Sequence, residues 1–500
     1  MKNDIKRVML IQPPAFANKW RTDINPNLPL GIAYIGAVLE KAGYKVKLLD
    51  AFVEGWDKEH PVENDMIRVG LSFGEIESRI RDFAPDIVGI SNLFTAQRKN
   101  AARVAQVVKK VNSSITVIMG GAHPTAVPEM AAQDENVDFV VLGEGENTIL
   151  ELIGCIEGKI NRHDLDGVAF RENGKVVVMP KTKFIEDLDS IPFPARHLLP
   201  MDEYSKAGVA HGGFLKRTPY ASIVTSRGCP CKCSFCTAYK VFSRKYRYRS
   251  VENVMAEIDM LVNKYGMKEL LFEDDNLTLN ANRAEAIFNA LIERKYDLIW
   301  DTPNGVAAFT LTRGILKKMK QSGCSQLNLA LESGNQWVID NLIKKPLKLD
   351  KVVPLIDYAR SIGMNVSSFF VVGMPGETLE QVRDTFRFAR RMKFYSPHWS
   401  VLTPYPGSEV YEICKEKGYL AKDFSFDNLM ITRYNVQTPD WTSKELDDTL
   451  QSEIRLLRFF YYLNNPFIFF KDFVPLFIKN PSNYLKRAVR VLFYMFKNLN

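Results

Sequence analysis

The sequence predicts an α/β protein with three parts: a doubly wound, Rossmann-like N-terminal domain, a partial (β/α)6 barrel, and a helical C-terminal region. Two observations predict the α/β class. Short β-rich runs alternate with helical patterns through the first 155 residues, and the same alternation resumes between about residues 220 and 405. A third observation sets the C-terminal region apart, because residues 455–500 combine basic and aromatic side chains and are interrupted by prolines.

Composition limits the classes of protein that the chain can belong to. Of its 500 residues, 46% are hydrophobic and 25% are charged, so the chain can bury more than one core and wholesale disorder is excluded. The net charge of +8 is too small to indicate nucleic-acid binding by itself. No apolar run reaches the length of about 18 residues typical of a membrane-spanning helix, and the first run is too short for a signal peptide. We therefore expect a cytoplasmic protein.

The N-terminal part is expected to form a parallel sheet with helices on both faces. The expected strands cover residues 7–11, 45–50, 86–91, 115–119 and 137–142. The expected helices cover residues 31–42, 75–83, 101–111, 124–132 and 146–156. Ligands of such sheets bind beyond the carboxyl ends of the strands. There the sequence places SNLFT (91–95), GGAHPT (120–125) and VLGEGE (141–146), whose glycines allow close approach to a ligand but also suit tight strand–helix turns.

Together with PNLPLGIAYIGAVLEKAGYKVKLLDA (26–51), these loops resemble the cobalamin-binding domain that precedes radical S-adenosylmethionine (SAM) enzymes, over about residues 5–155. The motif Asp-x-His-x-x-Gly, which supplies an axial histidine in many cobalamin proteins, is absent, and Gln12-Pro13-Pro14 stands in its place. A histidine ligand to cobalt from that loop is not expected, and His123 is either a residue near the corrin or an ordinary loop histidine. The resemblance implies that the cobalamin is lined by Ser91, Leu93, Thr95, Gly120, Gly121, His123, Glu144 and Gly145.

The strongest local signal is the cysteine loop in YASIVTSRGCPCKCSFCTAYK (220–240). Cys229, Cys233 and Cys236 have the spacing Cys-x3-Cys-x2-Cys, and three thiolates can hold three irons of a [4Fe–4S] cluster while the fourth iron stays open. Zinc would normally need a fourth ligand, which this loop does not supply at a suitable spacing. The loop, with Phe235 before the last cysteine, resembles the radical SAM superfamily, in which SAM binds the open iron. Cys231 is left unassigned.

Polar residues follow the expected barrel strands at 222–225, 269–272, 298–301, 326–330, 366–372 and 399–402. Catalytic groups of barrels gather at the carboxyl ends of the strands. The alternative for each acidic residue is a cap or salt bridge at the rim. By resemblance, SAM contacts are expected from Phe235, Glu273, Asp274, Glu332, Ser333, Gly373, Pro375 and Gly376; no catalytic side chain is assigned beyond the cofactors.

The expected domains are 1–155 (cobalamin-binding), 156–215 (a connector with a hairpin around Asn173-Gly174), 216–410 (radical SAM barrel) and 411–500 (helical, basic and aromatic). Only Cys155 precedes the cysteine loop, and only Cys324 and Cys414 follow it, so a single cluster is expected. Residues 455–500 carry eight basic residues and one acidic residue. They suit short amphipathic helices on an anionic membrane surface, or a helical subdomain packed on the barrel.

The resemblance covers about residues 5–410 and implies a radical SAM enzyme with three cofactors: a [4Fe–4S] cluster, SAM and cobalamin. The leading expectation is methylation of an unactivated carbon of a hydrophobic or lipid substrate, with a reductant such as flavodoxin or ferredoxin and no nucleic-acid partner. Peripheral contact with the inner face of the membrane through residues 455–500 is also expected. The alternatives are a cyclase or oxidase without methyl transfer, an enzyme that has lost cobalamin, and a cobalamin sensor or scaffold.

Overall fold

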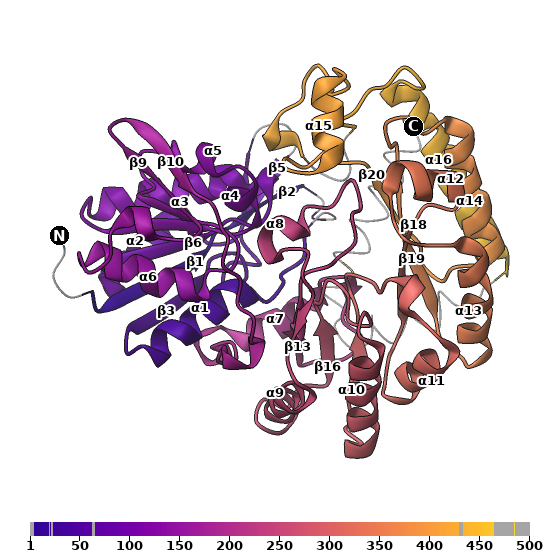
Figure 1. The fold of residues 1–500 in the computed structure, drawn as a ribbon, viewed down its shortest axis with the longest axis horizontal. Helices are drawn as coiled ribbons and strands as arrows, with labels where there is room; N and C mark the ends of the chain where they lie inside the picture. Colours follow the sequence, from indigo (N-terminus) through magenta and orange to yellow (C-terminus); the bar gives the residue numbers. More distant parts are fainter. Residues whose placement is uncertain are drawn as a thin grey trace. The chain divides into compact units, whose positions relative to one another are not determined.

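The computed structural model describes residues 5–19, 21, 24–62, 66–429, 434–464 and 485. The described chain divides into two compact units (Figure 1). Among the described residues, the first unit contains those up to Leu215 together with Ala238–Ser243 and Leu485, and the second contains Lys216–Thr237 and residues 244–464. The fold class agrees with the prediction: a doubly wound α/β unit followed by a partial barrel.

The first unit is built on a seven-stranded sheet in the order β10-β9-β8-β7-β6-β1-β3. Its parallel strands are β1 (Arg7–Gln12), β3 (Lys45–Asp50), β6 (Ile87–Ser91), β7 (Thr116–Gly120) and β8 (Phe139–Val141). Gln12 pairs with Asp50, and Ser91 pairs with Gly120. These strands therefore end in register, and their carboxyl ends form one edge at which the predicted cobalamin loops begin.

Helices cover both faces of this sheet, which explains why its central strands are almost continuously apolar. Helix α1 (Leu30–Lys41) contacts α6 (Glu146–Ile156), and α2 (Phe73–Phe83) contacts α3 (Arg98–Val111). One core, formed with α2 and α3, includes Met9, Val88 and Val117, none of which is exposed. Ser72 and Glu75 form a capping box that fixes the start of α2.

The sequence prediction was wrong at one helix of this unit. The expected single helix over 124–132 is two short helices, α4 (Ala122–Ala126) and α5 (Pro128–Ala132). Val127 between them has φ −137° and ψ 66°, because the proline that follows disfavours helical geometry at that position. Pro128 then opens α5, where its missing N–H costs nothing.

Two further features were not expected from the sequence. Strands β2 (Ala15–Asn18), β4 (Glu59–Pro61) and β5 (Met66–Val69) form a small antiparallel sheet. The hairpin expected in the connector, β9 (Val168–Glu172) and β10 (Lys175–Met179), pairs with β8 and extends the main sheet. At its turn, Asn173 and Gly174 have φ of 51° and 75°, as the expected type I′ turn requires.

The second unit contains six parallel strands in two groups of three. They are β13 (Tyr220–Ile223), β16 (Glu269–Phe272), β17 (Ile299–Asp301), β18 (Leu327–Glu332), β19 (Val366–Val372) and β20 (His398–Val401). Parallel bridges of Trp300 with Cys324 and of Val306 with Leu329 join the two groups. The connecting helices are α9 (Val251–Asn263), α10 (Ala281–Arg294), α11 (Arg313–Gln321), α13 (Leu349–Ser361) and α14 (Leu379–Met392) (Figure 1).

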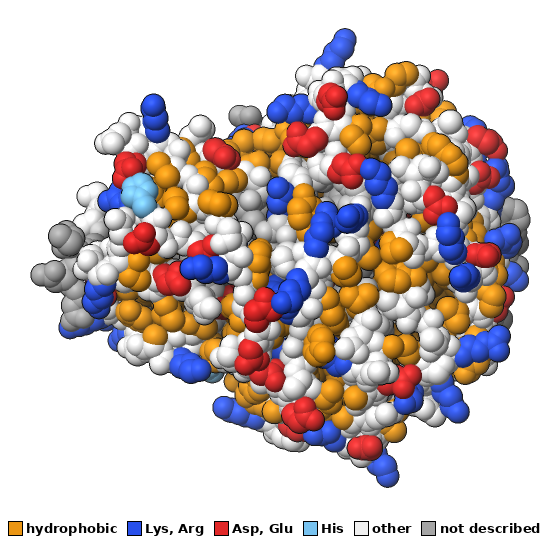
Figure 2. All heavy atoms as spheres, in the orientation of Figure 1, with side chains coloured by type: hydrophobic (Ala, Val, Ile, Leu, Met, Phe, Trp, Pro, Cys, Tyr) orange, Lys and Arg blue, Asp and Glu red, His pale blue; other side chains and the backbone are white. Residues whose placement is uncertain are grey.

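After β20 the chain continues into α15 (Glu409–Glu416) and α16 (Ser443–Asn464), and α16 contacts α14. Trp441 and Leu446 join the core beside β19 and α14. Most of the segment expected to form membrane-binding helices, residues 465–484 and 486–500, lies outside the described residues. Among the described helices, none is long and apolar enough to span a bilayer. On the face shown in Figure 2, basic and acidic side chains are interspersed.

Candidate functional site

At the carboxyl edge of the first sheet, two loops are locked together by backbone contacts. The N–H of Asn92 donates to the carbonyl of Gly120 (2.8 Å), and the N–H of His123 donates to the carbonyl of Asn92 (3.2 Å). Gly121, between them, has φ of 118°, and a Cβ at this position would lie 2.6 Å from the Asn92 carbonyl oxygen. Only glycine fits there, so this glycine is explained by loop packing as well as by ligand approach.

His123 is buried beneath this edge. Its Nδ1 lies 3.1 Å from the Oγ1 of Thr95, which is also buried. Burial, assisted by the nearby Arg98 guanidinium, lowers the pKa of His123 to about 4, so the imidazole is neutral near pH 7. The structure therefore brings together two residues of the predicted cobalamin set as a hydrogen-bonded pair.

The neighbouring loop exposes two large apolar side chains. Leu93 is 46% exposed and Phe94 is 60% exposed, directly after the end of β6 at Ser91. Exposed apolar side chains next to glycine-lined loops fit a large, flat, partly apolar ring. Such a ring would bury the apolar surface of these side chains, which is exposed to solvent. The residues at this edge thus fit a corrin. Phe94 was not in the predicted set, although it lies within the quoted SNLFT motif.

The last two predicted cobalamin residues have contacts within the protein. The buried Glu144 carboxylate accepts a hydrogen bond from the N–H of Ile185 (2.8 Å). Gly145 begins α6, and a Cβ there would lie 3.0 Å from the Cδ1 of Ile35. Both positions are accounted for by packing, and their contact with cobalamin stays a prediction.

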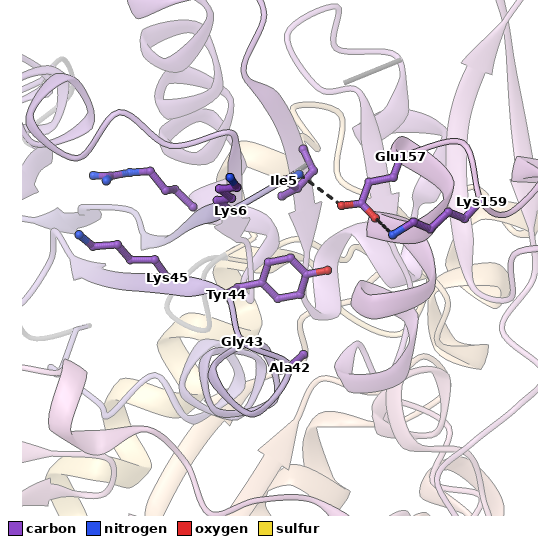
Figure 3. A pocket seen from close by; sticks show the side chains of 9 residues that line it. Ile5, Lys6, Ala42, Gly43, Tyr44, Lys45, Glu157 and Lys159 are labelled. Atoms are coloured by element: carbon purple, nitrogen blue, oxygen red, sulfur yellow. Dashed lines mark hydrogen bonds and ion pairs between the residues drawn. The ribbon is translucent and has the colours of Figure 1, made fainter. Parts of the chain in front are cut away.

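A pocket of about 670 Å3 opens at the opposite edge of the same sheet. It is lined by the amino ends of β1 and β3 and by the chain after α6, where Glu157 accepts from the N–H of Ile5 and pairs with Lys159 (Figure 3). Because cofactors of doubly wound sheets bind at the carboxyl edge, this pocket is not the expected cofactor site.

In the second unit, the cysteine loop is framed by a short antiparallel pair. Strand β14 (Ser226–Arg227), just before the loop, pairs with β15 (Arg247–Tyr248) after it. Within the loop, the N–H of Cys236 donates to the carbonyl of Cys233 (3.1 Å). The two cysteines that close the motif are therefore held in one tight turn.

Ser234 anchors this turn and was missed by sequence analysis. It is buried, its N–H donates to the carbonyl of Ile343 (3.0 Å), and its hydroxyl donates to the carbonyl of Leu342 (2.6 Å). Its own carbonyl accepts from the N–H of Val410 at the start of α15 (3.0 Å). Nothing in the local sequence marks Ser234, because all three partners come from distant parts of the chain.

None of the seven cysteines forms a disulfide, and Cys229, Cys233 and Cys236 are half-buried. A hydrogen bond with Cys231 lowers the pKa of Cys229 to about 7, whereas burial raises the pKa of Cys233 to about 12. In the part of the chain that the structure describes, no three His, Cys, Asp or Glu side chains converge on a single metal ion. Three thiols spread along one loop instead fit a cluster, because each thiolate then binds a different iron.

The acidic segment after β16 supports the backbone that leads into this loop. The buried Asp274 accepts from the N–H of Thr225 and from the hydroxyls of Thr225 (2.7 Å) and Ser226. Asp275 accepts from the N–H of Gly228, directly before Cys229 (3.1 Å). The predicted SAM contact of Asp274 stays a prediction, since the structure shows its carboxylate engaged with the protein itself.

Glu273, the other acidic residue predicted to contact SAM, lies at the carboxyl end of β16 and is only partly buried. Its Oε1 lies 3.3 Å from the Ser222 hydroxyl, and its Oε2 accepts from the Asn304 side chain, also at 3.3 Å. Next along the chain, Asn276 is buried, and neither polar atom of its amide has a hydrogen-bond partner.

At the end of β18, the buried Glu332 forms an ion pair with the buried Lys345 (2.8 Å). Burial alone would lower the pKa of Lys345, but the Glu332 carboxylate and the Cys233 thiol outweigh burial, and the net pKa is raised. Lys345 was not predicted from the sequence. It brings a positive charge to the cysteine loop, and Glu332, predicted to contact SAM, is its counter-ion.

The remaining predicted SAM residues line the ends of β18 and β19. The Ser333 hydroxyl lies 3.0 Å from the Thr385 hydroxyl on α14. The turn after β19 contains Gly373, Pro375 and Gly376, of which Pro375 is half-buried and Gly376 is exposed. Phe235 packs against the core that contains Ile343 and Val372. The predicted SAM residues thus lie at the ends of strands β16, β18 and β19 and in the cysteine loop.

Two family models match this chain. The model described as "B12 binding domain" matches residues 25–153, and the model described as "Radical SAM superfamily" matches residues 223–389. The first match ends on α6, and the second begins at the end of β13, six residues before Cys229. The two candidate sites therefore fall within separately matched regions.

Two relatives match over most of the chain. Cytidylyl-2-hydroxyethylphosphonate methyltransferase from Streptomyces wedmorensis is 34% identical over 472 residues, which are 88% of this chain and 88% of that protein. Anaerobic magnesium-protoporphyrin IX monomethyl ester cyclase from Rubrivivax gelatinosus is 28% identical over 451 residues, covering 88% of this chain and 74% of that protein.

Among solved structures, the cobalamin-dependent S-adenosylmethionine radical enzyme OxsB, with aqua-cobalamin and S-adenosylmethionine bound, has a similar fold. The TM-score is 0.71 at 16% sequence identity, and the match covers 97% of this chain and 72% of that chain. At this identity, the likeness supports the fold.

Proposed function

This chain belongs to the cobalamin-dependent radical SAM enzymes, and we propose that it transfers a methyl group to an unactivated carbon of its substrate. The observation that carries the proposal is the 34% identity to a methyltransferase over 88% of both chains. The complete Cys-x3-Cys-x2-Cys loop, with none of its three thiols in a disulfide, supports an active enzyme rather than a sensor with a vestigial barrel.

The cofactors are a [4Fe–4S] cluster, SAM and cobalamin. We assign the cluster to Cys229, Cys233 and Cys236, and the cobalamin to the loops around Leu93 and Gly121. When bound, these groups supply reductive SAM cleavage and a methyl donor, chemistry that protein side chains cannot perform.

The chain's own residues bind and orient these groups. Ser234 fixes the turn between Cys233 and Cys236, and Asp275 fixes the backbone before Cys229. Such fixed positions matter because a displacement of about 1 Å at a reacting group can cost about a hundredfold in rate. The neutral His123, held by Thr95, places an uncharged side chain beneath the proposed corrin site.

The substrate is proposed to be hydrophobic or membrane-associated, supported by the basic and aromatic composition of residues 455–500. Family membership does not select a substrate, because the two relatives are named for different compounds. Binding to anionic liposomes at low salt tests the membrane contact. A variant that ends at residue 464 is the control and should not bind the liposomes. If the full-length protein does not bind them either, the membrane contact is contradicted.

A second candidate is ring closure or oxidation without methyl transfer. It is favoured by the 28% identity to the cyclase from Rubrivivax gelatinosus. The two reactions differ in product mass, since methylation adds one methyl group and cyclisation adds none.

The first experiment is to express the full chain with cobalamin supplied, to purify it without oxygen, and to measure corrin and iron. We expect about one corrin and about four irons per chain. The loaded protein is then incubated with reductant, metabolite extract and SAM labelled in its methyl group, and products are examined by mass spectrometry. A labelled product supports methyl transfer, and Cys233→Ala is the matched inactive control. Four irons without corrin would contradict methyl transfer from cobalamin.

A further inference from the structure

Two adjacent lysines in the second unit have opposite environments. Lys344 is exposed and pairs with Glu409 at the start of α15, whereas Lys345 is 8% exposed and pairs with the buried Glu332. Burying an ammonium group costs free energy unless the group compensates negative charge, so the burial of Lys345 needs a physical explanation.

The backbone before Lys345 turns it inward. Residues Ile339–Ile343 form a π-helix, a rare element that is frequent at functional sites. Lys344 ends this element in the left-handed region, with φ of 62°, and the N–H groups of both lysines donate to the carbonyl of Ile339. The tight turn directs Lys344 to the surface and Lys345 into the protein.

The same π-helix holds the cysteine loop. Ser234 donates to the carbonyls of Leu342 and Ile343, so the loop is tied to the chain two residues before Lys345. The positive charge of Lys345 acts on the pKa of the Cys229 and Cys233 thiols in the direction that favours the thiolates. Its charge is therefore applied to two of the three proposed cluster ligands.

Glu332 partly offsets the positive charge of Lys345. Its carboxylate lies 2.8 Å from the Lys345 Nζ, which also donates to the carbonyl of Ala330 (2.6 Å). Glu332 has φ of 68°, and the register of β18 against β19 shifts between Ala330 and Glu332. A non-glycine residue in this left-handed conformation is strained, and in this conformation the carboxylate lies beside the ammonium. Glu332 also acts electrostatically on Cys233, with the sign opposite to that of Lys345.

We propose that Lys345 and Glu332 set the reduction potential of the cluster in opposite directions, Lys345 raising the potential and Glu332 lowering it. Reduction adds one electron and no proton, so the cluster with its thiolates becomes more negative by one charge. A buried cation stabilises that added charge, and a buried anion destabilises it. The inference rests on the proposed function only in requiring the cluster at Cys229, Cys233 and Cys236, and it does not require methyl transfer.

The test uses the full chain, reconstituted without oxygen, and measures iron content and the potential at which the reduced cluster appears by electron paramagnetic resonance in the absence of SAM. Lys345→Met is expected to keep its iron and to shift the potential to more negative values. We expect at least a tenfold change in the reduction equilibrium, which for one electron is about 59 mV. Glu332→Gln is expected to shift the potential to more positive values.

The controls separate charge from general damage. Lys344→Met removes a neighbouring positive charge that faces solvent, and its potential should match the wild type. Lys345→Arg keeps the charge and should restore most of the potential. The double variant Lys345→Met/Glu332→Gln should lie between the two single variants.

Each outcome decides the inference. A loaded Lys345→Met variant with the wild-type potential overturns it. If Lys345→Met does not retain iron, the test rests on Glu332→Gln. A positive shift of the reduction potential in Glu332→Gln supports the inference, and a negative shift or no shift overturns it. A wild type that takes up no cluster overturns the proposed function and this inference together. If the wild type takes up the cluster but the variants have the wild-type reduction potential, this inference is overturned and the proposed function is not.

Discussion

The Oε2 of Glu377 accepts a hydrogen bond of 2.7 Å from the backbone N–H of Gly373. The same oxygen accepts from Met374 (3.0 Å), and the indole N–H of Trp441 donates to the backbone carbonyl of Glu377 (2.8 Å). The other carboxylate oxygen is buried and has no partner. A single fully buried side chain thus holds the turn after β19 that contains the predicted SAM residues Gly373, Pro375 and Gly376.

Replacing Glu377 by Gln should remove a pH dependence of stability. Burial raises the pKa of Glu377 from 4.5 to about 7, so the folded protein binds a proton that the unfolded chain releases. The stabilisation is complete below pH 4.5 and is lost as pH rises through about 7, amounting to at most about 3 kcal/mol. Thermal unfolding should show that, between pH 5 and pH 8, the wild type loses more stability than Glu377→Gln does.

The matched control for that variant is Glu380→Gln on the exposed first turn of α14, where hydrogen bonds with arginines lower the pKa of the carboxyl. Glu380→Gln should not be more stable than the wild type at pH 8, whereas Glu377→Gln should be. An equal difference between wild type and Glu377→Gln at both pH values would contradict the prediction.

Gly121→Ala should destabilise the first unit. The new Cβ would lie 2.6 Å from the Asn92 carbonyl oxygen, at a φ of 118° that alanine rarely adopts. The expected loss is about 2–4 kcal/mol, measured by denaturant unfolding. Gly31→Ala on the exposed face of α1, where a Cβ meets no atom within 4 Å, should instead gain up to about 1 kcal/mol. Equal effects of the two variants would refute the packing argument.

Phe94→Asp should weaken cobalamin uptake without unfolding the protein. The side chain is 60% exposed, so its replacement removes few contacts in the folded chain, but it places a charge where an apolar ring is expected. Corrin absorbance after reconstitution should fall at least tenfold at limiting cobalamin, while the unfolding midpoint stays within about 2 °C. Ile160→Asp, at a less exposed apolar site on the chain after α6 (36%), should load normally. Normal loading of Phe94→Asp would show that cobalamin does not contact this loop.

Cys231→Ala should retain the cluster, whereas Ala at Cys229, Cys233 or Cys236 should not. Cys231 lies outside the Cys-x3-Cys-x2-Cys spacing and acts on Cys229 through a hydrogen bond that lowers the pKa of that thiol. Iron and sulfide analysis after anaerobic reconstitution measures the difference. Loss of iron in Cys231→Ala, with the other variants unaffected, would assign the cluster to a different set of thiols.

The regular strands and their order of appearance could be predicted because the signal is local. The strands at 45–50, 269–272 and 366–372 were predicted to the residue, since each is a short run with apolar residues, most of them β-branched, leucine or phenylalanine, between helical patterns. The small sheet of β2, β4 and β5 was missed because its strands are short and mixed in polarity, and one of them ends in Pro61. Their pairing is visible only once the chain has folded.

The candidate site was predictable to the same extent. The cysteine spacing and the strand-end motifs are contiguous in sequence, so they could be found by inspection. Ser234 and Lys345 could not, because each acquires its role from distant partners: Ser234 from Leu342 and Val410, and Lys345 from Glu332. Buried polar side chains that join separate segments leave no periodic trace in a sequence.

The assignment of Ala238–Ser243 to the first unit has a consequence for how this enzyme can be divided. The chain leaves the second unit one residue after Cys236 and returns to it at Arg244, and between these points α8 (Ala238–Phe242) contacts α4. A fragment starting at Lys216 would carry α8 without α4, and a fragment ending at Leu215 would carry α4 without α8. The proposed cobalamin-binding module therefore depends on a stretch of chain that a cut at Leu215 would leave with the barrel. A boundary placed at Leu215 is therefore expected to destabilise the first unit, even though the chain passes from one unit to the other at that residue.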